Sequence, residues 1–165
     1  RIAWRATDKI SFQVHGGLEV RQLLSGGAGD VINPVAGAVI QYQPFATTKL
    51  LLTADRAVST ALVLASSSAN QVTESTAIGG NLNQRLFKRF YLDLGGGYNT
   101  TTYVDSSNAS AGREDEYYSL NVRLSCSFLK RGTAAVFYQK SDNSSTASGY
   151  AFSSSQVGLE VGYRY

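Results

Sequence analysis

The chain has 165 residues, of which 43% are hydrophobic, and its 15 Lys and Arg exceed its 12 Asp and Glu by little. No apolar run approaches the roughly 18 residues of a membrane helix, and the scattered basic residues leave no footprint for nucleic acid. Cys126 is the only cysteine, which excludes an internal disulfide. Abundant Tyr and Gly with only 2 Pro favour a β-rich chain, and we expect one domain over residues 1–165.

The first three predicted strands cover Lys9–Leu23, Val35–Gln43 and Thr48–Val58. In each of them apolar side chains occupy every second position, which is the period of a strand with one apolar and one polar face. Arg56 breaks the apolar side of the third segment. The pattern therefore predicts strands with one apolar face and one polar face, rather than helices.

The next three predicted strands are Val72–Leu86, Phe90–Tyr98 and Tyr117–Phe128. Glu74 interrupts the apolar side of the first of these segments. Tyr117–Phe128 alternates most regularly, and a helical period of 3.6 residues would scatter its apolar side chains around the whole cylinder. This segment is the clearest β-strand of the chain.

The last two predicted strands are Thr133–Lys140, in which Phe137 is out of pattern, and Gln156–Tyr165. The final segment alternates strictly and stops on the aromatic Tyr165. It resembles the last strand of outer-membrane β-barrels, whose terminal aromatic residue is read by the assembly machinery. The resemblance implies the barrel-assembly machinery as a partner through the C-terminal strand.

The connections between the predicted strands alternate between short and long. The short ones fall near Ala6–Asp8, Pro44–Thr47, Phe87–Arg89 and Leu129–Gly132. The long ones, rich in Ser, Gly and Asn, fall near Leu24–Pro34, Ser59–Gln71, Thr100–Glu116 and Ser141–Ser153. Short turns at one end and long loops at the other are typical of outer-membrane barrels. We therefore predict an all-β, antiparallel up-and-down transmembrane β-barrel with about eight strands in this chain.

Aromatic residues gather near both ends of the predicted strands, where amphipathic rings would lie between hydrocarbon and water. The candidate girdle consists of Tyr42, Phe90, Tyr98, Tyr118, Phe128, Tyr138, Tyr163 and Tyr165. The alternative is that aromatic residues simply favour strands.

Charged residues on the opposite side of the strands are candidates for the lumen. They are Glu19, Arg21, Lys49, Asp55, Arg85, Asp93, Arg123, Glu160 and Arg164. In a wide pore such mixed charges would give weak ion preference, whereas in a closed barrel they would pair into a structural network. Many small residues on the same side favour a wider lumen, although glycines there could also relieve strand curvature.

No residue pattern points to catalysis, a metal or a cofactor. His15 is the only histidine, and no Gly-x-Ser-x-Gly elbow accompanies it. No cluster has metal-ligand spacing. Gly95–Gly97 lies inside a predicted strand with no helix after it, so it is not a phosphate loop. We expect no enzyme.

Several stretches together resemble the type 2 family of outer-membrane β-barrel porins. They are Trp4–Lys9, Gly17–Arg21, Gln41–Phe45, Thr48–Arg56, Gln84–Tyr91 and Gly95–Tyr98. The resemblance implies the outer membrane of a Gram-negative bacterium and supplies no catalytic residue; some relatives are associated with polysaccharide export. Family members are about twice as long or longer. Because Ile2 and Trp4 resemble the end of a strand, we expect this chain to be the C-terminal part of a larger barrel.

Three functions are open at the level of sequence. The first is porin-like passage of small polar solutes, or a part in an envelope polysaccharide export system. The second is a non-conducting outer-membrane anchor or surface-loop interaction protein. The third is a soluble barrel with apolar residues inside, because alternation alone does not give the sign of the two faces. The terminal aromatic residue and the girdles favour apolar residues outside, against outer-membrane lipid.

Overall fold

The computed structural model describes residues 1–21, 31–61, 71–105, 112–128 and 131–164. These residues form nine strands and no helix. The strands are β1 (Ile2–Thr7), β2 (Ile10–Arg21), β3 (Val31–Phe45), β4 (Thr48–Ala61), β5 (Gln71–Leu86), β6 (Phe90–Asp105), β7 (Arg113–Phe128), β8 (Gly132–Ser145) and β9 (Phe152–Tyr163). Within these ranges, therefore, no helix is long and apolar enough to cross a membrane.

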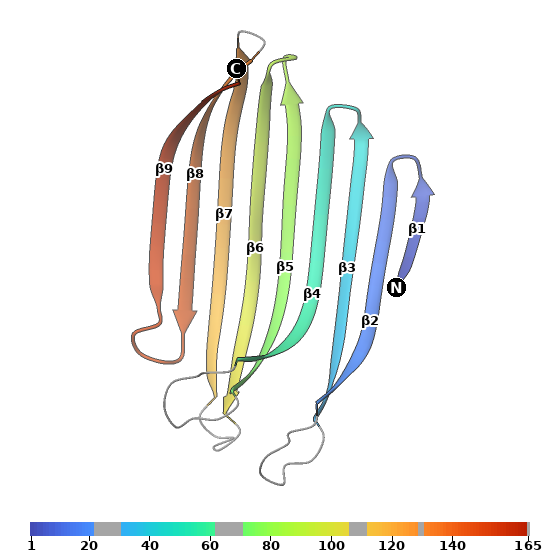
Figure 1. The fold of residues 1–165 in the computed structure, drawn as a ribbon, viewed down its shortest axis with the longest axis vertical. Helices are drawn as coiled ribbons and strands as arrows, with labels where there is room; N and C mark the ends of the chain where they lie inside the picture. Colours follow the sequence, from blue (N-terminus) through green and yellow to red (C-terminus); the bar gives the residue numbers. More distant parts are fainter. Residues whose placement is uncertain (22–30, 62–70, 106–111, 129–130, 165) are drawn as a thin grey trace.

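All nine strands belong to one antiparallel sheet in which each strand pairs with its neighbours in sequence. Figure 1 shows this up-and-down order, with β1 and β9 at opposite edges. The predicted all-β, up-and-down class is confirmed. The ninth strand is β1, which contains the Ile2 and Trp4 that were expected to end a preceding strand. The described strands form an open sheet rather than a closed barrel.

The described short turns, β1–β2, β3–β4 and β5–β6, lie at one end of the sheet, and the described β8–β9 connection lies at the other (Figure 1). All four predicted long loops were placed too wide, because β3 begins at Val31, β4 continues to Ala61, β6 continues to Asp105, β7 begins at Arg113 and β8 continues to Ser145. Thr101, Asp115 and Ser145 lie in one register row there. The apolar alternation stops before the ladder does, since backbone pairing needs no apolar side chain. Residues 129 and 130, in a predicted turn, lie outside the described ranges.

The register of the sheet is staggered. The row that begins at Ile10, the first residue of β2, passes through Tyr42 and Leu50 and reaches Val122 of β7. Residues 123–128 of β7 still follow Val122 before the strand ends. In Figure 1 the hairpin turns accordingly step along the sheet from β1–β2 through β3–β4 to β5–β6. A stagger of this kind is what a sheet needs in order to curl into a barrel.

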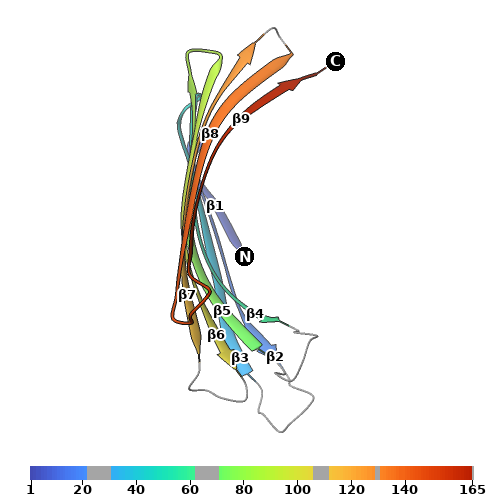
Figure 2. The same ribbon diagram turned by 90° about the vertical axis from the view of Figure 1, so that its left-hand side faces the viewer.

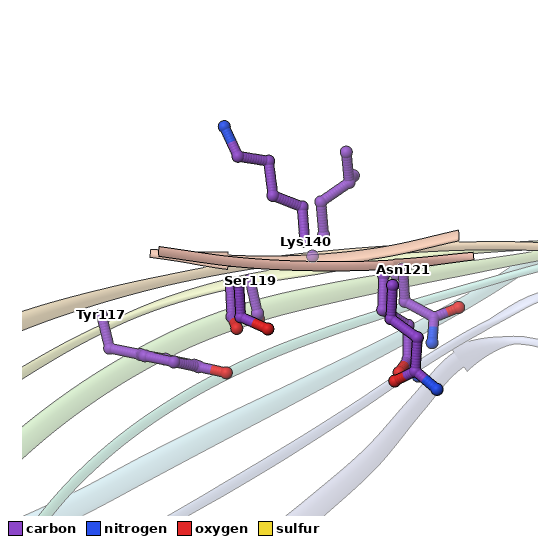
Figure 3. Close-up of a pocket in the computed structure, with 11 residues that line it drawn as sticks. Tyr117, Ser119, Asn121 and Lys140 are labelled. Atoms are coloured by element: carbon purple, nitrogen blue, oxygen red, sulfur yellow. The ribbon is translucent and has the colours of Figure 1, made fainter. Parts of the chain in front are cut away.

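The sheet is bowed, and its two faces differ in polarity. Figure 2 shows the bow from the side. In Figure 3, Tyr117, Ser119 and Asn121 project towards the side to which the N-terminal strands curve, and Lys140 projects from the other side. Lys140 is in register with Leu120 and therefore shares its face. The face with Tyr117, Ser119 and Asn121 is hereafter the concave face, and that with Leu120 is the convex face.

Most apolar side chains of the strands share the convex face and have nothing packed over them. Register rows place Leu124 beside Leu92 and Val136, and Val136 beside Leu159. Among the described residues, only Val58 and Ala135 are buried apolar residues, whereas Leu159 is 79% exposed. A sheet normally buries its apolar face against a second layer. Here the described chain supplies a single layer only.

The β5–β6 turn contains two residues in the left-handed region, Phe87 with φ 48° and Lys88 with φ 61°. They are the first two residues of the three-residue loop between Leu86 and Phe90, and this region is one that glycine adopts more readily than residues with a Cβ atom. The Nε and Nη2 atoms of Arg85 donate hydrogen bonds to the carbonyl oxygen of Lys88, at 3.2 and 2.9 Å. Hydrogen bonds from Arg85 thus stabilise the turn. Phe87 and Lys88 are unfavourable there, because residues with a Cβ atom rarely adopt positive φ.

Replacing Lys88 by Gly should stabilise the fold by about 1 kcal/mol, because glycine adopts positive φ without the steric penalty of a Cβ atom. Urea unfolding of the protein measures this change. Lys9→Gly, in the β1–β2 turn where no positive φ occurs, is the matched control and should be neutral or destabilising. A loss of stability in Lys88→Gly would contradict the backbone explanation.

Candidate functional site on the concave face

The charged residues predicted to face a lumen lie on the concave side wherever their side chains are described. Lys49, Asn83, Asp93 and Arg123 form one register row, and Arg85 and Glu160 belong to the next row. Further members are Asp55, which shares a row with Tyr117, and Glu19, which lies two rows beyond Asp55 towards the loops. Arg164 follows the end of β9, where its N–H donates to the carbonyl of Arg131 at 3.0 Å. The side chain of Arg21 and all of Tyr165 lie outside the described part.

Near the short turns, the charged side chains of the concave face bond to one another. The Nδ2 atom of Asn83 donates a hydrogen bond to Oδ1 of Asp93. Arg123 reaches across β8 to Glu160, with Nη2 and Oε2 2.6 Å apart. Both members of that ion pair are roughly half exposed, so its contribution to stability is below about 1 kcal/mol. The two rows carry three positive residues, Lys49, Arg85 and Arg123, and two negative ones, Asp93 and Glu160, which together are hereafter the charged band.

Phe137, the aromatic residue that broke the sequence pattern, lies on the concave face in the row of Arg123. Its ring covers Gly158 of β9, where a Cβ atom would overlap the ring. A glycine without a side chain leaves room that a cross-strand aromatic ring can fill. The exception to alternation therefore has a packing partner on the next strand.

A second pair of ionisable groups meets over a glycine. Nε2 of His15 on β2 lies 3.7 Å from Oδ1 of Asp55 on β4, above Gly37 of β3. Each side chain is about half exposed. Their register row continues through Ala77, Asn99, Tyr117 and Asn143 and contains no Ser or Cys. His15 therefore has no serine or cysteine in this row that it could activate as a nucleophile. The row does not contain the Ser-His-Asp arrangement of a serine hydrolase.

A cation–aromatic cluster lies towards the long loops. The guanidinium carbon of Arg113 is 3.7 Å from the ring centroid of Tyr103 and 4.0 Å from that of Tyr150. Arg113 also pairs with Asp115 at 2.9 Å. The cluster links β6 and β7 to the β8–β9 turn. Sequence reasoning missed it because these residues lay in predicted loops. No group of three metal-binding side chains occurs in the described part of the chain.

Between these charged regions, the concave face carries a row rich in amides. From β2 to β9 the register runs through Ser11, Gln41, Leu51, Asn81, Gly95, Asn121, Gln139 and Gln156. This set is the amide row. The adjacent row, from Gln13 through Ser119 to Ser154, is also free of charge. On the edge strand β1, Arg5 is in register with Ser11.

A hollow of about 460 Å³ lies over β6 to β9, at the β9 end of the amide row. Its lining includes Asn121, Gln139 and Gln156 of the row, together with Tyr117 and Ser119. Figure 3 shows Tyr117, Ser119 and Asn121 on its concave side and the amine of Lys140 pointing away from them. The concave side of the hollow therefore offers neutral hydrogen-bonding groups.

The convex face carries the predicted girdle residues Tyr42, Phe90, Tyr98, Tyr118, Phe128, Tyr138 and Tyr163, which share register rows with its apolar side chains. The stretch from Tyr118 to Phe128 spans roughly 34 Å along β7. At a strand tilt of about 40° it would cover about 26 Å along a bilayer normal, close to the height of a barrel's apolar band. Beyond it, Arg56 and Glu74 pair at 3.2 Å.

Comparison of the chain with protein-family models, curated proteins and solved structures gives no significant match. The functional interpretation consequently depends on the two faces of the sheet and on the chemistry of their side chains.

Truncation of Phe137 to Ala should lower the free energy of unfolding by about 1–2 kcal/mol, because the half-buried ring loses its contact with the Gly158 surface. Thr133→Ala, on the same strand and face but exposed, should change it by less than about 0.5 kcal/mol. Urea unfolding compares the two variants. Equal effects would mean that Phe137 does not pack on Gly158.

Proposed function

We propose that this chain forms the wall of an outer-membrane β-barrel whose convex face contacts lipid and whose concave face lines a water-filled lumen. Its function would be porin-like passage of small polar solutes, or a part in an envelope polysaccharide export system. The proposal places the protein in the outer membrane of a Gram-negative bacterium. Membership of the type 2 porin family, and use of the barrel-assembly machinery, stay predictions from the sequence.

The proposal depends on the direction in which the sheet is bowed. The polar face is concave and the apolar face is convex. A soluble ligand-binding barrel would have the reverse arrangement, with apolar residues lining the interior. Large exposed apolar surfaces mark contact with a membrane or another protein. An apolar surface on the outside of a bowed sheet fits lipid better than it fits an internal ligand.

Strand length supports the same proposal. The strands β2 to β9 contain 12 to 16 residues, and about 9–11 residues suffice for a tilted strand to cross a bilayer. On the convex face, Lys140 pairs with Asp142 at 3.2 Å on the loop side of Tyr138. Charges at that depth are inexpensive, because the penalty falls towards the interface.

A non-conducting anchor or surface-loop interaction protein is the second candidate. The pairs Arg123–Glu160 and His15–Asp55 favour it, because side chains that bond across a lumen wall are typical of filled, closed barrels. Conductance separates the two candidates.

The two faces can be tested with the single native thiol. Cys126 lies on the convex side and Ser125, its neighbour in β7, lies on the concave side. In lipid vesicles, Cys126 should resist a charged, membrane-impermeant maleimide until the protein is unfolded. A Cys126→Ser/Ser125→Cys variant should react at least about tenfold faster, because its thiol would face water.

The wild-type chain and the double variant differ only in which face presents the thiol, so each is the control for the other. Rapid labelling of Cys126 together with protection of the Ser125→Cys thiol would reverse the faces and overturn the membrane proposal. A chain that stays soluble and monomeric without detergent would overturn it as well.

Passage is tested by conductance in a planar bilayer, with the full natural chain purified from membranes and refolded in detergent. We expect steady channels with weak ion selectivity, since positive and negative side chains are mixed on the concave face. Folded, strand-rich protein that gives no channels would exclude the pore and favour the anchor. A strong preference for one sign of ion would contradict the mixed signs of the charged band.

A further inference from the structure

We propose that the amide row is a binding track for an uncharged, hydroxyl-rich solute such as an oligosaccharide. The inference rests on the proposed function, because the row faces a lumen only if the sheet forms a barrel wall. It adds to that function a solute class and the residues that would recognise it, namely Gln41, Asn81, Asn121, Gln139 and Gln156.

The amides of the row have unused hydrogen-bonding capacity. Within the described part of the chain, none of the five amide side chains bonds to another protein group. Other amides of the concave face are engaged, since Asn83 donates to Asp93 and Asn99 donates to Thr101. The row therefore presents donors and acceptors to whatever fills the concave side.

The chemistry of the row suits hydroxyl groups better than ions. A primary amide offers two N–H donors and a carbonyl acceptor, and a serine hydroxyl offers both functions as well. A sugar hydroxyl likewise donates and accepts, so each contact can be satisfied in either direction. An ionic solute would give up hydration without finding an opposite charge in the two neutral rows, which is unfavourable.

The placement of the row suits a chain-like solute. Register rows run across the strands, and barrel strands tilt by about 35–45°, so the row would cross the lumen wall obliquely. Consecutive strands offer an amide about every 4.8 Å over β7, β8 and β9. The hollow there also includes Tyr117, whose ring can lie against the apolar face of a sugar.

The test is block of the potassium chloride current of the full natural chain in a planar bilayer by maltohexaose, a neutral oligosaccharide. We expect concentration-dependent block that is about tenfold weaker in an Asn121→Ala/Gln139→Ala variant, which loses two hydrogen-bonding side chains. An anionic oligosaccharide of the same length should block the wild type at least about tenfold more weakly than maltohexaose.

The matched control is Asn83→Ala/Asn99→Ala, which removes two amides of the same face that already bond within the protein. It should keep the wild-type block. The conductance without sugar shows that each variant is folded and open.

Steady channels that maltohexaose does not block would overturn the inference and leave the proposed function standing. Equal block in both double variants would also overturn the inference, because the amides of the row would then contribute no more to sugar binding than other amides of the concave face. Absence of channels would overturn the proposed function, and the binding track with it.

Discussion

The exposed apolar side chains of the convex face are the constraint on which this structure depends, because nothing in the described part of the chain covers them. Exposing a Leu, Val or Ile side chain to water costs about 1.5–3 kcal/mol, and Leu159, Val161 and Val157 alone are each more than 70% exposed. Almost no apolar core is available among the described residues to compensate for that surface. Every strand turns its apolar side to the convex face, so the antiparallel pairing gathers the exposed apolar surface on one side and the polar side chains on the other.

Alternation made the faces predictable because its period of two is local and is preserved by any antiparallel pairing. Leu120, Val122 and Leu124 could therefore be placed together without knowing their partners. The partners themselves could not be predicted, since the register depends on turn geometry and stagger. For this reason the amide row, in which Asn121 lies between Gly95 and Gln139, was invisible in the sequence. The ends of the strands were missed because Thr101 and Asp115 pair through backbone groups and carry no apolar signal.

The exceptions to alternation are resolved in pairs. Arg56 and Glu74 each broke the apolar pattern of its own strand, and the structure joins them at 3.2 Å on the convex face. Phe137 broke the polar pattern of β8 and covers Gly158 on β9. The sequence of one strand shows only the residue that breaks the pattern, whereas the pairing of the strands shows the residue that it contacts. Out-of-pattern residues in such sheets are therefore evidence about which strands are neighbours.

Strand number constrains how this sheet could close. Eight successive antiparallel pairings make β1 and β9 run in the same direction. Joining the two edges directly would create a parallel pair, and joining copies related by rotation about the barrel axis would create one at every seam. An entirely antiparallel barrel instead needs an odd number of further strands between β9 and β1, which restores the even total of bacterial outer-membrane barrels. Antiparallel pairing alone therefore cannot close the nine described strands into a barrel.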